Sequence, residues 1–373
     1  MLAAGLGGLG VGAAGGAAIT GAVVRDESPS TPPPASVAIR PFGDTQAGVD
    51  TPRIPQSFAR YTVADLDLTS LADTLTLLGK AIGGLADPSH SFPDGVGDLT
   101  VLVGLGPRPL NALLPAPHDE LLDMPPFRGD DLLDPLSVGG DLLLIIAASD
   151  PNVLDPAYRA VIASVKGVQV RWTELGFRGA GVRDVARNPL GFHDGIAIPR
   201  SPDGLADGVW IQDGPLSNGT ICVIRRFVLD VDRFSALSSD EQNAIIGRDK
   251  VTGSPLTGGA LHDDVDITAK QPDGTFIIPA HAHIRAAHPS FTGSPLMLRR
   301  SYGFTPSDAS SPSGFTSGML FTSFQNDIRT FVKTQQRMDE SDALMSYARV
   351  TASAAFAVLP GYDRDSPLGT LSP

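Results

Sequence analysis

Three of the chain's seven histidines, His281, His283 and His288, lie within eight positions of one another. Clustered imidazoles are a common means of holding a metal ion. On a strand, His281 and His283 would share one face, as a zinc site requires, with a carboxylate or a third histidine as partner. One axial imidazole would equally serve a haem iron. A surface loop whose histidines bind only water is the third interpretation, and this segment alone does not decide among them.

Two other groups of residues could carry chemistry. Asp194 lies between Gly191 and Gly195, which allow a close backbone approach or a positive φ. An Asp-Gly pair is, however, most often only a turn. Arg299 and Arg300 enter an otherwise apolar strand, where a salt bridge at the rim is the simplest role. Neither group identifies a reaction by itself.

Composition limits the class of protein. The chain has 373 residues, 42% of them hydrophobic and 18% charged, which is typical of a globular protein large enough for two domains. The formal net charge of −13 would repel a phosphate backbone, so no nucleic-acid partner is expected. The single cysteine, Cys222, excludes an internal disulfide, and its apolar neighbours predict an inert core thiol.

The first forty residues differ from the rest of the chain. Residues 1–24 are almost entirely Gly, Ala, Leu and Val, which resembles the apolar region of an export signal. Their mild hydrophobicity favours a signal of the twin-arginine type, with its arginines upstream of this start, over a membrane anchor. If the start is correct, we expect a cytoplasmic protein. Residues 25–40 contain Pro, Ser and Thr and predict a linker.

From Phe58 onward, one pattern of strands and helices occurs twice. The first copy is predicted, in the order β-α-β-β-α-β, over residues 58–66, 68–82, 99–104, 141–148, 155–166 and 168–175. The second copy is predicted in the same order over residues 220–229, 239–247, 296–304, 318–324, 328–338 and 354–359. This order is the ferredoxin-like unit. The sequence therefore predicts an α+β fold of two ferredoxin-like domains, residues 41–200 and 201–373, with the histidines in a long insertion.

Taken in this order, the motifs resemble those of the dye-decolorizing peroxidases, a family of haem b peroxidases built from two ferredoxin-like domains. The resemblance covers nearly the whole chain from Pro41 onward. No single motif is decisive, but several motifs in the correct order are strong evidence. The motifs are Pro41-Phe42-Gly43, Leu99-Thr100-Val101, Gln169-Val170-Arg171-Trp172, Gly191-x-x-Asp194-Gly195, Ala282-His283-Ile284-Arg285 and Glu340-Ser341-Asp342-Ala343-Leu344. The last is a block of the exported bacterial branch.

The resemblance implies the chemistry of peroxide. Asp194, flanked by Gly191 and Gly195, would take a proton from bound hydrogen peroxide and return it to the leaving oxygen. Arg299, more than Arg300, would offer a fixed cation to the negative charge that develops on the peroxide oxygens.

The resemblance also implies how the cofactor is held. His283 would be the axial ligand of the iron in one haem b per chain, in a pocket formed mainly by the C-terminal domain. Asp342 would accept the other ring N–H of His283 and make the ligand more anionic, with Glu340 as the competing candidate. His281 and His288 would be bystanders or residues at the rim of the site.

Three functions remain open at this point. The leading one is a peroxidase that reduces hydrogen peroxide while it oxidises a bulky organic reductant such as a dye or a phenol. The second is a deferrochelatase-like protein that releases iron from haem, with partners in an iron-uptake system. The third and most remote is a zinc hydrolase built on the three histidines, which leaves the Gly191 to Gly195 match unexplained. A homodimer is compatible with each. One residue departs from the family pattern: Ile198 stands where an Asn is usual near the haem edge.

Overall fold

The computed structural model describes residues 38–87, 89, 91–114, 119–181, 184–307 and 316–371. The predicted export-signal segment, residues 1–24, and nearly all of the predicted linker therefore lie outside the described residues. The described residues belong to one compact unit, Ser36–Pro373. Among them, no helix has both the length and the apolar character that crossing a membrane requires.

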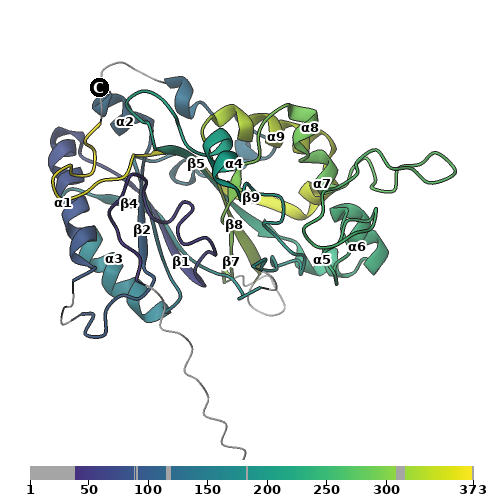
Figure 1. The fold of residues 1–373 in the computed structure, drawn as a ribbon, viewed down its shortest axis with the longest axis horizontal. Helices are drawn as coiled ribbons and strands as arrows, with labels where there is room; N and C mark the ends of the chain where they lie inside the picture. The colour runs from purple at the N-terminus through teal and green to yellow at the C-terminus, as the bar shows by residue number, and fades with distance from the viewer. Residues whose placement is uncertain are drawn as a thin grey trace, which may run out of the picture. The chain divides into compact units, whose positions relative to one another are not determined.

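The first half of the chain forms the predicted β-α-β-β-α-β unit. Its strands are β1 (Phe58–Asp65), β2 (Thr100–Leu105), β3 (Leu142–Ala148) and β4 (Gln169–Phe177), paired antiparallel in the order β2-β3-β1-β4. Helices α1 (Leu71–Gly84) and α3 (Leu154–Ile162) pack on one face of this sheet (Figure 1). The short helix α2 (Pro107–Leu113) follows β2. Short 3-10 helices span Leu68–Ser70, Asp119–Leu122, Asp130–Leu132, Pro135–Ser137 and Pro151–Val153.

The second half repeats the arrangement. Its strands are β5 (Thr220–Leu229), β6 (Leu298–Arg299), β7 (Tyr302–Phe304), β8 (Ser317–Gln325) and β9 (Ala348–Val358). β5 lies between β8 and β9, and both β6 and β7 pair with β8. Its helices are α5 (Val231–Ser235), α6 (Ser239–Ile246), α7 (His283–Ala286), α8 (Pro289–Thr292), α9 (Ile328–Ser341) and the 3-10 helix Ala343–Tyr347. Helix α4 (Pro202–Gly208) connects the two halves.

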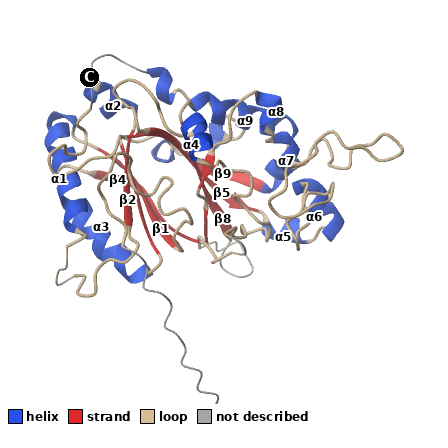
Figure 2. Cartoon of the chain, in the orientation of Figure 1, coloured by secondary structure: helices blue, strands red, loops and turns tan. Residues whose placement is uncertain are grey.

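The two sheets join at both edges. β2 pairs with β9 at Gly104↔Val358, and β4 pairs with β7 at Phe177↔Gly303, so the strands close into one ring. At the first of these junctions a Cβ on Gly104 would lie 2.9 Å from the Cβ of Phe356, so only glycine allows the strands to approach this closely. Large apolar side chains of both sheets fill the interior of the ring. Figure 2 shows the strands gathered together with the helices outside them.

The predicted α+β fold of two ferredoxin-like units is confirmed, with two local differences. The strand predicted over residues 296–304 is interrupted at Arg300 and Ser301. The pieces on either side, β6 and β7, keep one register against β8. The last strand, predicted over residues 354–359, begins at Ala348 because β9 pairs with β5 along its whole length. Cys222 is buried, as predicted.

Candidate active site

A cavity of about 1150 Å³, called the main cavity below, lies between the second sheet, helices α7 and α9, and the segment that precedes α4. Ligand cavities usually measure about 300–1000 Å³, so this one suits a large ligand. Asp194, His283 and Arg299 all line it. The fold therefore brings together three residues that are far apart in the sequence.

The first residue of α7, His283, is held by a carboxylate from beyond the end of α9. Its Nδ1 lies 2.6 Å from Oδ2 of Asp342, whose side chain is completely buried. The other oxygen of Asp342 accepts a hydrogen bond from the backbone N–H of Leu344 at 2.9 Å. Glu340, the competing candidate, is exposed. Since Nδ1 is engaged, Nε2 is the nitrogen that His283 can offer to a ligand in the main cavity.

The charge state of this pair follows from its surroundings. Burial alone would lower the pKa of His283, but the charge of Asp342 and its hydrogen bond outweigh burial and raise the pKa above its ordinary value. The Arg299 guanidinium opposes this rise more weakly, and Asp194 adds to it. The carboxylate therefore keeps a proton on Nδ1 and fixes the orientation of the ring.

The other two clustered histidines serve different purposes. His281 is exposed, and only its backbone carbonyl is engaged, by the N–H of Ala343 at 3.0 Å. Nδ1 of His288 accepts from the N–H of Ser290 at 3.2 Å and so caps α8. The segment is not a strand, and the described residues contain no group of three or more His, Cys, Asp or Glu able to hold a metal ion. The zinc interpretation thus has no support in the described part of the chain.

Asp194 ends a loop that is closed by its own hydrogen bonds. Its backbone N–H donates to the carbonyl of Ala186 at 2.9 Å. Arg187 donates to the carbonyls of Gly191, Lys250 and Val251 at 2.6, 2.6 and 2.9 Å. The Asn188 side chain accepts from the N–H groups of Leu190 and Phe192. The carboxylate is thereby presented on a restrained backbone.

The two glycines that bracket Asp194 share a backbone conformation that favours glycine. Both have positive φ, +86° at Gly191 and +82° at Gly195. A Cβ on Gly191 would lie 2.8 Å from Cε of Lys250, whereas one on Gly195 would meet nothing within 4 Å. The Lys250 side chain is flexible and could move aside, so both glycines are favoured chiefly by their positive φ.

The two arginines point to opposite sides of their strand. Arg299, on β6, lines the main cavity and donates to the carbonyl of Ala197 at 2.9 Å, just beyond Asp194 in the chain. Arg300 is buried and donates to the carbonyls of Val49 and Pro52 at 2.9 and 2.8 Å, in the first half of the chain. Alternation along the strand therefore directs only Arg299 into the cavity.

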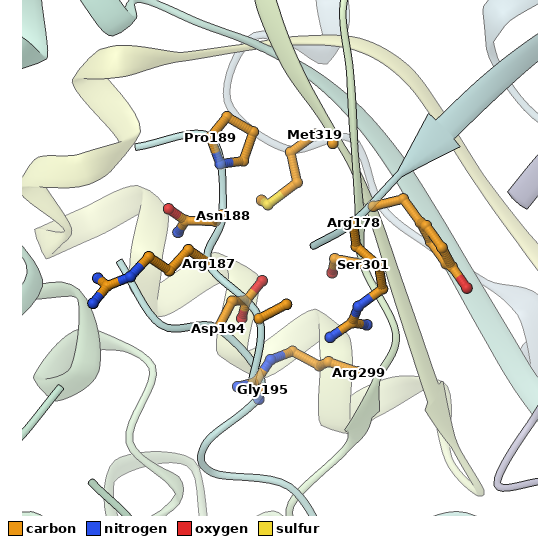
Figure 3. Close-up of a pocket in the computed structure, with 12 residues that line it drawn as sticks. Arg178, Arg187, Asn188, Pro189, Asp194, Gly195, Arg299, Ser301 and Met319 are labelled. Carbon is orange, nitrogen blue, oxygen red and sulfur yellow. The ribbon is translucent and has the colours of Figure 1, made fainter. Parts of the chain in front are cut away.

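A second, smaller space, called the side pocket below, shares lining residues with the main cavity and measures about 20 Å³, room for roughly one water-sized molecule. Asp194 and Arg299 line both spaces, as does the thioether-bearing Met319 of β8. Figure 3 shows the Asp194 carboxylate facing this space and the Met319 sulfur entering it from another side. Met319 was not predicted from the sequence as a residue of the site. Alternation along the predicted strand 318–324 could have shown which face of the strand its side chain occupies.

Comparison with known proteins identifies the group to which this architecture belongs. A family model for the N-terminal part of Dyp-type peroxidases matches residues 46–178, and one for the C-terminal part matches residues 185–363. The chain belongs to the Dyp-type peroxidase family. The enzyme class expected from the sequence, a haem peroxidase, is thereby confirmed.

Individual relatives of this family fall into two groups by name. The chain is 34% identical over 284 residues to a dye-decolorizing peroxidase of Thermobifida fusca; the match covers 70% of this chain and 64% of that protein, less than two thirds of it. It is 30% identical over 366 residues to a deferrochelatase of Yersinia pestis, a match that covers 86% of this chain and 81% of that one.

Solved structures of the family agree with the fold. A DyP-type peroxidase from Cellulomonas bogoriensis superimposes with a TM-score of 0.80 at 32% identity, covering 91% of this chain and 98% of that one. Ferric DtpA from Streptomyces lividans gives a TM-score of 0.80 at 28% identity, covering 90% and 96%.

Proposed function

We propose that the main cavity holds one haem b, with His283 as the axial ligand of its iron. The observation that carries this proposal is the buried Asp342 carboxylate on Nδ1, which leaves Nε2 of a cavity-lining imidazole free for the metal. Apolar side chains from β5, β8 and α9, among them Phe227, Phe321 and Phe331, line the same cavity and suit a large flat ring system. Haem, when bound, supplies the redox chemistry of the reaction.

The residues of the chain supply proton transfer and charge stabilisation. Asp194 accepts a proton from one oxygen of hydrogen peroxide and delivers it to the other, so that the leaving oxygen departs as water. Arg299 stabilises the negative charge that builds on the oxygens as their bond breaks. Both residues line the side pocket, which has room for about one water-sized molecule, and both also line the main cavity. Ile198 also lines the main cavity, so at this point an apolar side chain borders the site.

The reductant that we propose is a bulky organic molecule such as a dye or a phenol. The name of the Thermobifida fusca relative supports this substrate class. The second candidate function, release of iron from haem, is favoured by the deferrochelatase relatives, which match a larger share of the chain. Partners in iron uptake belong with this second candidate, whereas export by a twin-arginine-type signal remains a prediction for either function.

One experiment separates the candidates. The protein is loaded with haem and given hydrogen peroxide with a phenol or an anthraquinone dye, or incubated without peroxide beside an iron chelator. We expect rapid oxidation of the reductant in the first mixture and an intact haem spectrum in the second. Loss of the haem spectrum with appearance of the chelated iron, without peroxide, would instead support iron release. Absence of a haem spectrum after loading would contradict both.

A further inference from the structure

The thioether of Met319 shares the side pocket with the two residues assigned to peroxide. Met319 lies on β8, opposite Phe227 of β5 and Gly303 of β7. Its neighbour Leu320 faces the interior of the strand ring, and so Met319 faces the cavity. Met319 lines both the main cavity and the side pocket, and it is only partly buried.

The other methionines provide an internal comparison. Of the six in the chain, Met297, Met338 and Met345 also line the main cavity. None of these three lines the side pocket, so they do not share that space with Asp194 and Arg299. Met338 belongs to α9 and Met345 to the 3-10 helix that follows Asp342, on the side where His283 is held. Four methionines therefore line the main cavity, but only Met319 also shares the side pocket with Asp194 and Arg299.

We propose that Met319 is a built-in site of oxidation by hydrogen peroxide, whose conversion to the sulfoxide limits the enzyme when reductant is scarce. This inference rests on the proposed function, because it requires peroxide to bind beside Asp194 and Arg299. A thioether sulfur is a soft nucleophile, and oxidation to the sulfoxide is its ordinary reaction with peroxide.

The reaction needs no reagent beyond the peroxide itself. The sulfur of Met319 forms a bond to one peroxide oxygen and gives up two electrons, while the O–O bond breaks. The proton on the attacked oxygen passes through the Asp194 carboxylate to the departing oxygen, which leaves as water. The products are one methionine sulfoxide and one water. Arg299 stabilises the departing oxygen in this reaction as it does in the proposed reduction of peroxide.

The sulfoxide would change the site in which it forms. It replaces an apolar sulfur with a polar S=O group that accepts hydrogen bonds. The cationic Arg299 is a strong donor that lines the same pocket, and a bond to the S=O oxygen would draw it away from incoming peroxide. Because the pocket has room for about one water-sized molecule, the added oxygen also takes space that peroxide needs. Methionine sulfoxide reductases reverse the change, so the loss of activity would be recoverable.

The test follows oxidation at each methionine by mass. The haem-loaded protein receives hydrogen peroxide in small additions without reductant, and samples are digested and analysed for a gain of one oxygen at each methionine. Met319 should be oxidised at least tenfold faster than Met338 or Met345, and its oxidation should parallel the loss of peroxide consumption. Met319→Leu, which keeps an apolar side chain of similar size, should lose activity more slowly per peroxide added, whereas the matched Met338→Leu should lose it like the wild type.

A third variant tests the assigned chemistry. In Asp194→Asn, oxidation of Met319 should slow to the rate at Met338. Oxidation of Met338 or Met345 as fast as Met319, or an unmodified Met319 in protein that has stopped consuming peroxide, would overturn the proposal. Failure of the underlying function is distinguishable, because the haem-loaded protein would then consume no peroxide from the start.

Discussion

Nδ1 of His283 and Oδ2 of Asp342 lie 2.6 Å apart, although 59 positions of sequence separate the two residues. The carboxylate is completely buried and the imidazole retains 32% of its side-chain exposure, at the cavity. A carboxylate on the far nitrogen of a metal-binding histidine fixes its orientation and makes it a stronger electron donor. The pair should therefore influence the iron in the haem-bound protein and the pH dependence of stability in the haem-free protein. These two effects can be measured separately.

In the haem-bound protein, Asp342→Asn should weaken haem binding or activity by about ten- to a hundredfold. The neutral amide no longer makes the imidazole anionic, so the reduction potential of the iron should rise. Haem titration and spectroelectrochemistry measure the two effects. Glu340→Gln is the control, because Glu340 is exposed and should change neither quantity. A shift of potential in Glu340→Gln but not in Asp342→Asn would reverse the assignment.

In the haem-free protein, the same pair should make stability depend on pH. The pKa of His283 is raised in the folded state, above an unfolded value of about 6.5. The stabilisation is therefore fully present below about pH 6.5 and is lost as pH rises through the folded-state pKa. Melting temperatures of the wild type and Asp342→Asn, measured between pH 5.5 and 9, should differ most at the acid end. A difference independent of pH would contradict this.

Haem binding should depend on one histidine of the three. His283→Ala should lose the Soret band, because the buried Asp342 carboxylate holds Nδ1 of this cavity-lining imidazole and leaves Nε2 for the iron. His281→Ala should keep the band, because that side chain is exposed. His288→Ala should also keep it, with a modest loss of stability from the uncapped helix, about 1 kcal/mol. An absorption spectrum after haem loading decides, and a lost band in either control variant would contradict the assignment.

Reaction with peroxide should depend on the charge of Asp194. Asp194→Asn keeps the shape of the side chain and removes the base, which typically costs about a hundred- to ten-thousandfold. Stopped-flow mixing of the ferric protein with peroxide measures the rate of the first spectral change. Asp184→Asn is a matched control, since Asp184 also lines the cavity but is paired with Arg53. If Asp194→Asn reacts at the wild-type rate, Arg299 carries the main catalytic role instead.

The sequence predicted the repeated units well because their strands and helices are strongly periodic. Its helix at residues 328–338 corresponds to α9, and the apolar run at residues 220–229 is β5 itself. The choice of Arg299 over Arg300 came from resemblance, whereas the structure supplies a physical basis in the carbonyls of Val49 and Pro52 that bind Arg300 from the other half of the chain. Contacts between residues so far apart in the sequence produce no local periodicity, and they could not be predicted from the sequence pattern. Arg187 is a further example, since its partners Lys250 and Val251 lie more than 60 positions away.

Arg187 provides the last prediction, because it restrains the Asp194 loop without reaching the reacting atoms. Its guanidinium donates to three backbone carbonyls, and although Arg187 lines the side pocket, Figure 3 shows the guanidinium directed away from Asp194. Lysine keeps the positive charge but lacks the several N–H donors that the guanidinium holds in a fixed plane. Arg187→Lys should therefore weaken the restraint on the Asp194 loop. Misplacement of a catalytic group by about 1 Å can cost up to about a hundredfold in rate.

Two readouts distinguish this positioning role from a general loss of structure. Arg187→Lys should slow the reaction with peroxide, as measured by stopped-flow, while the haem spectrum and haem affinity stay at wild-type values, because His283 is held by a separate part of the chain. Arg171→Lys is the matched control: its guanidinium also donates to a backbone carbonyl, that of Pro135 at 2.9 Å, but Arg171 does not line the side pocket, as Arg187 does. A wild-type peroxide rate in Arg187→Lys would show that the loop holds Asp194 through its backbone hydrogen bonds and Asn188 alone.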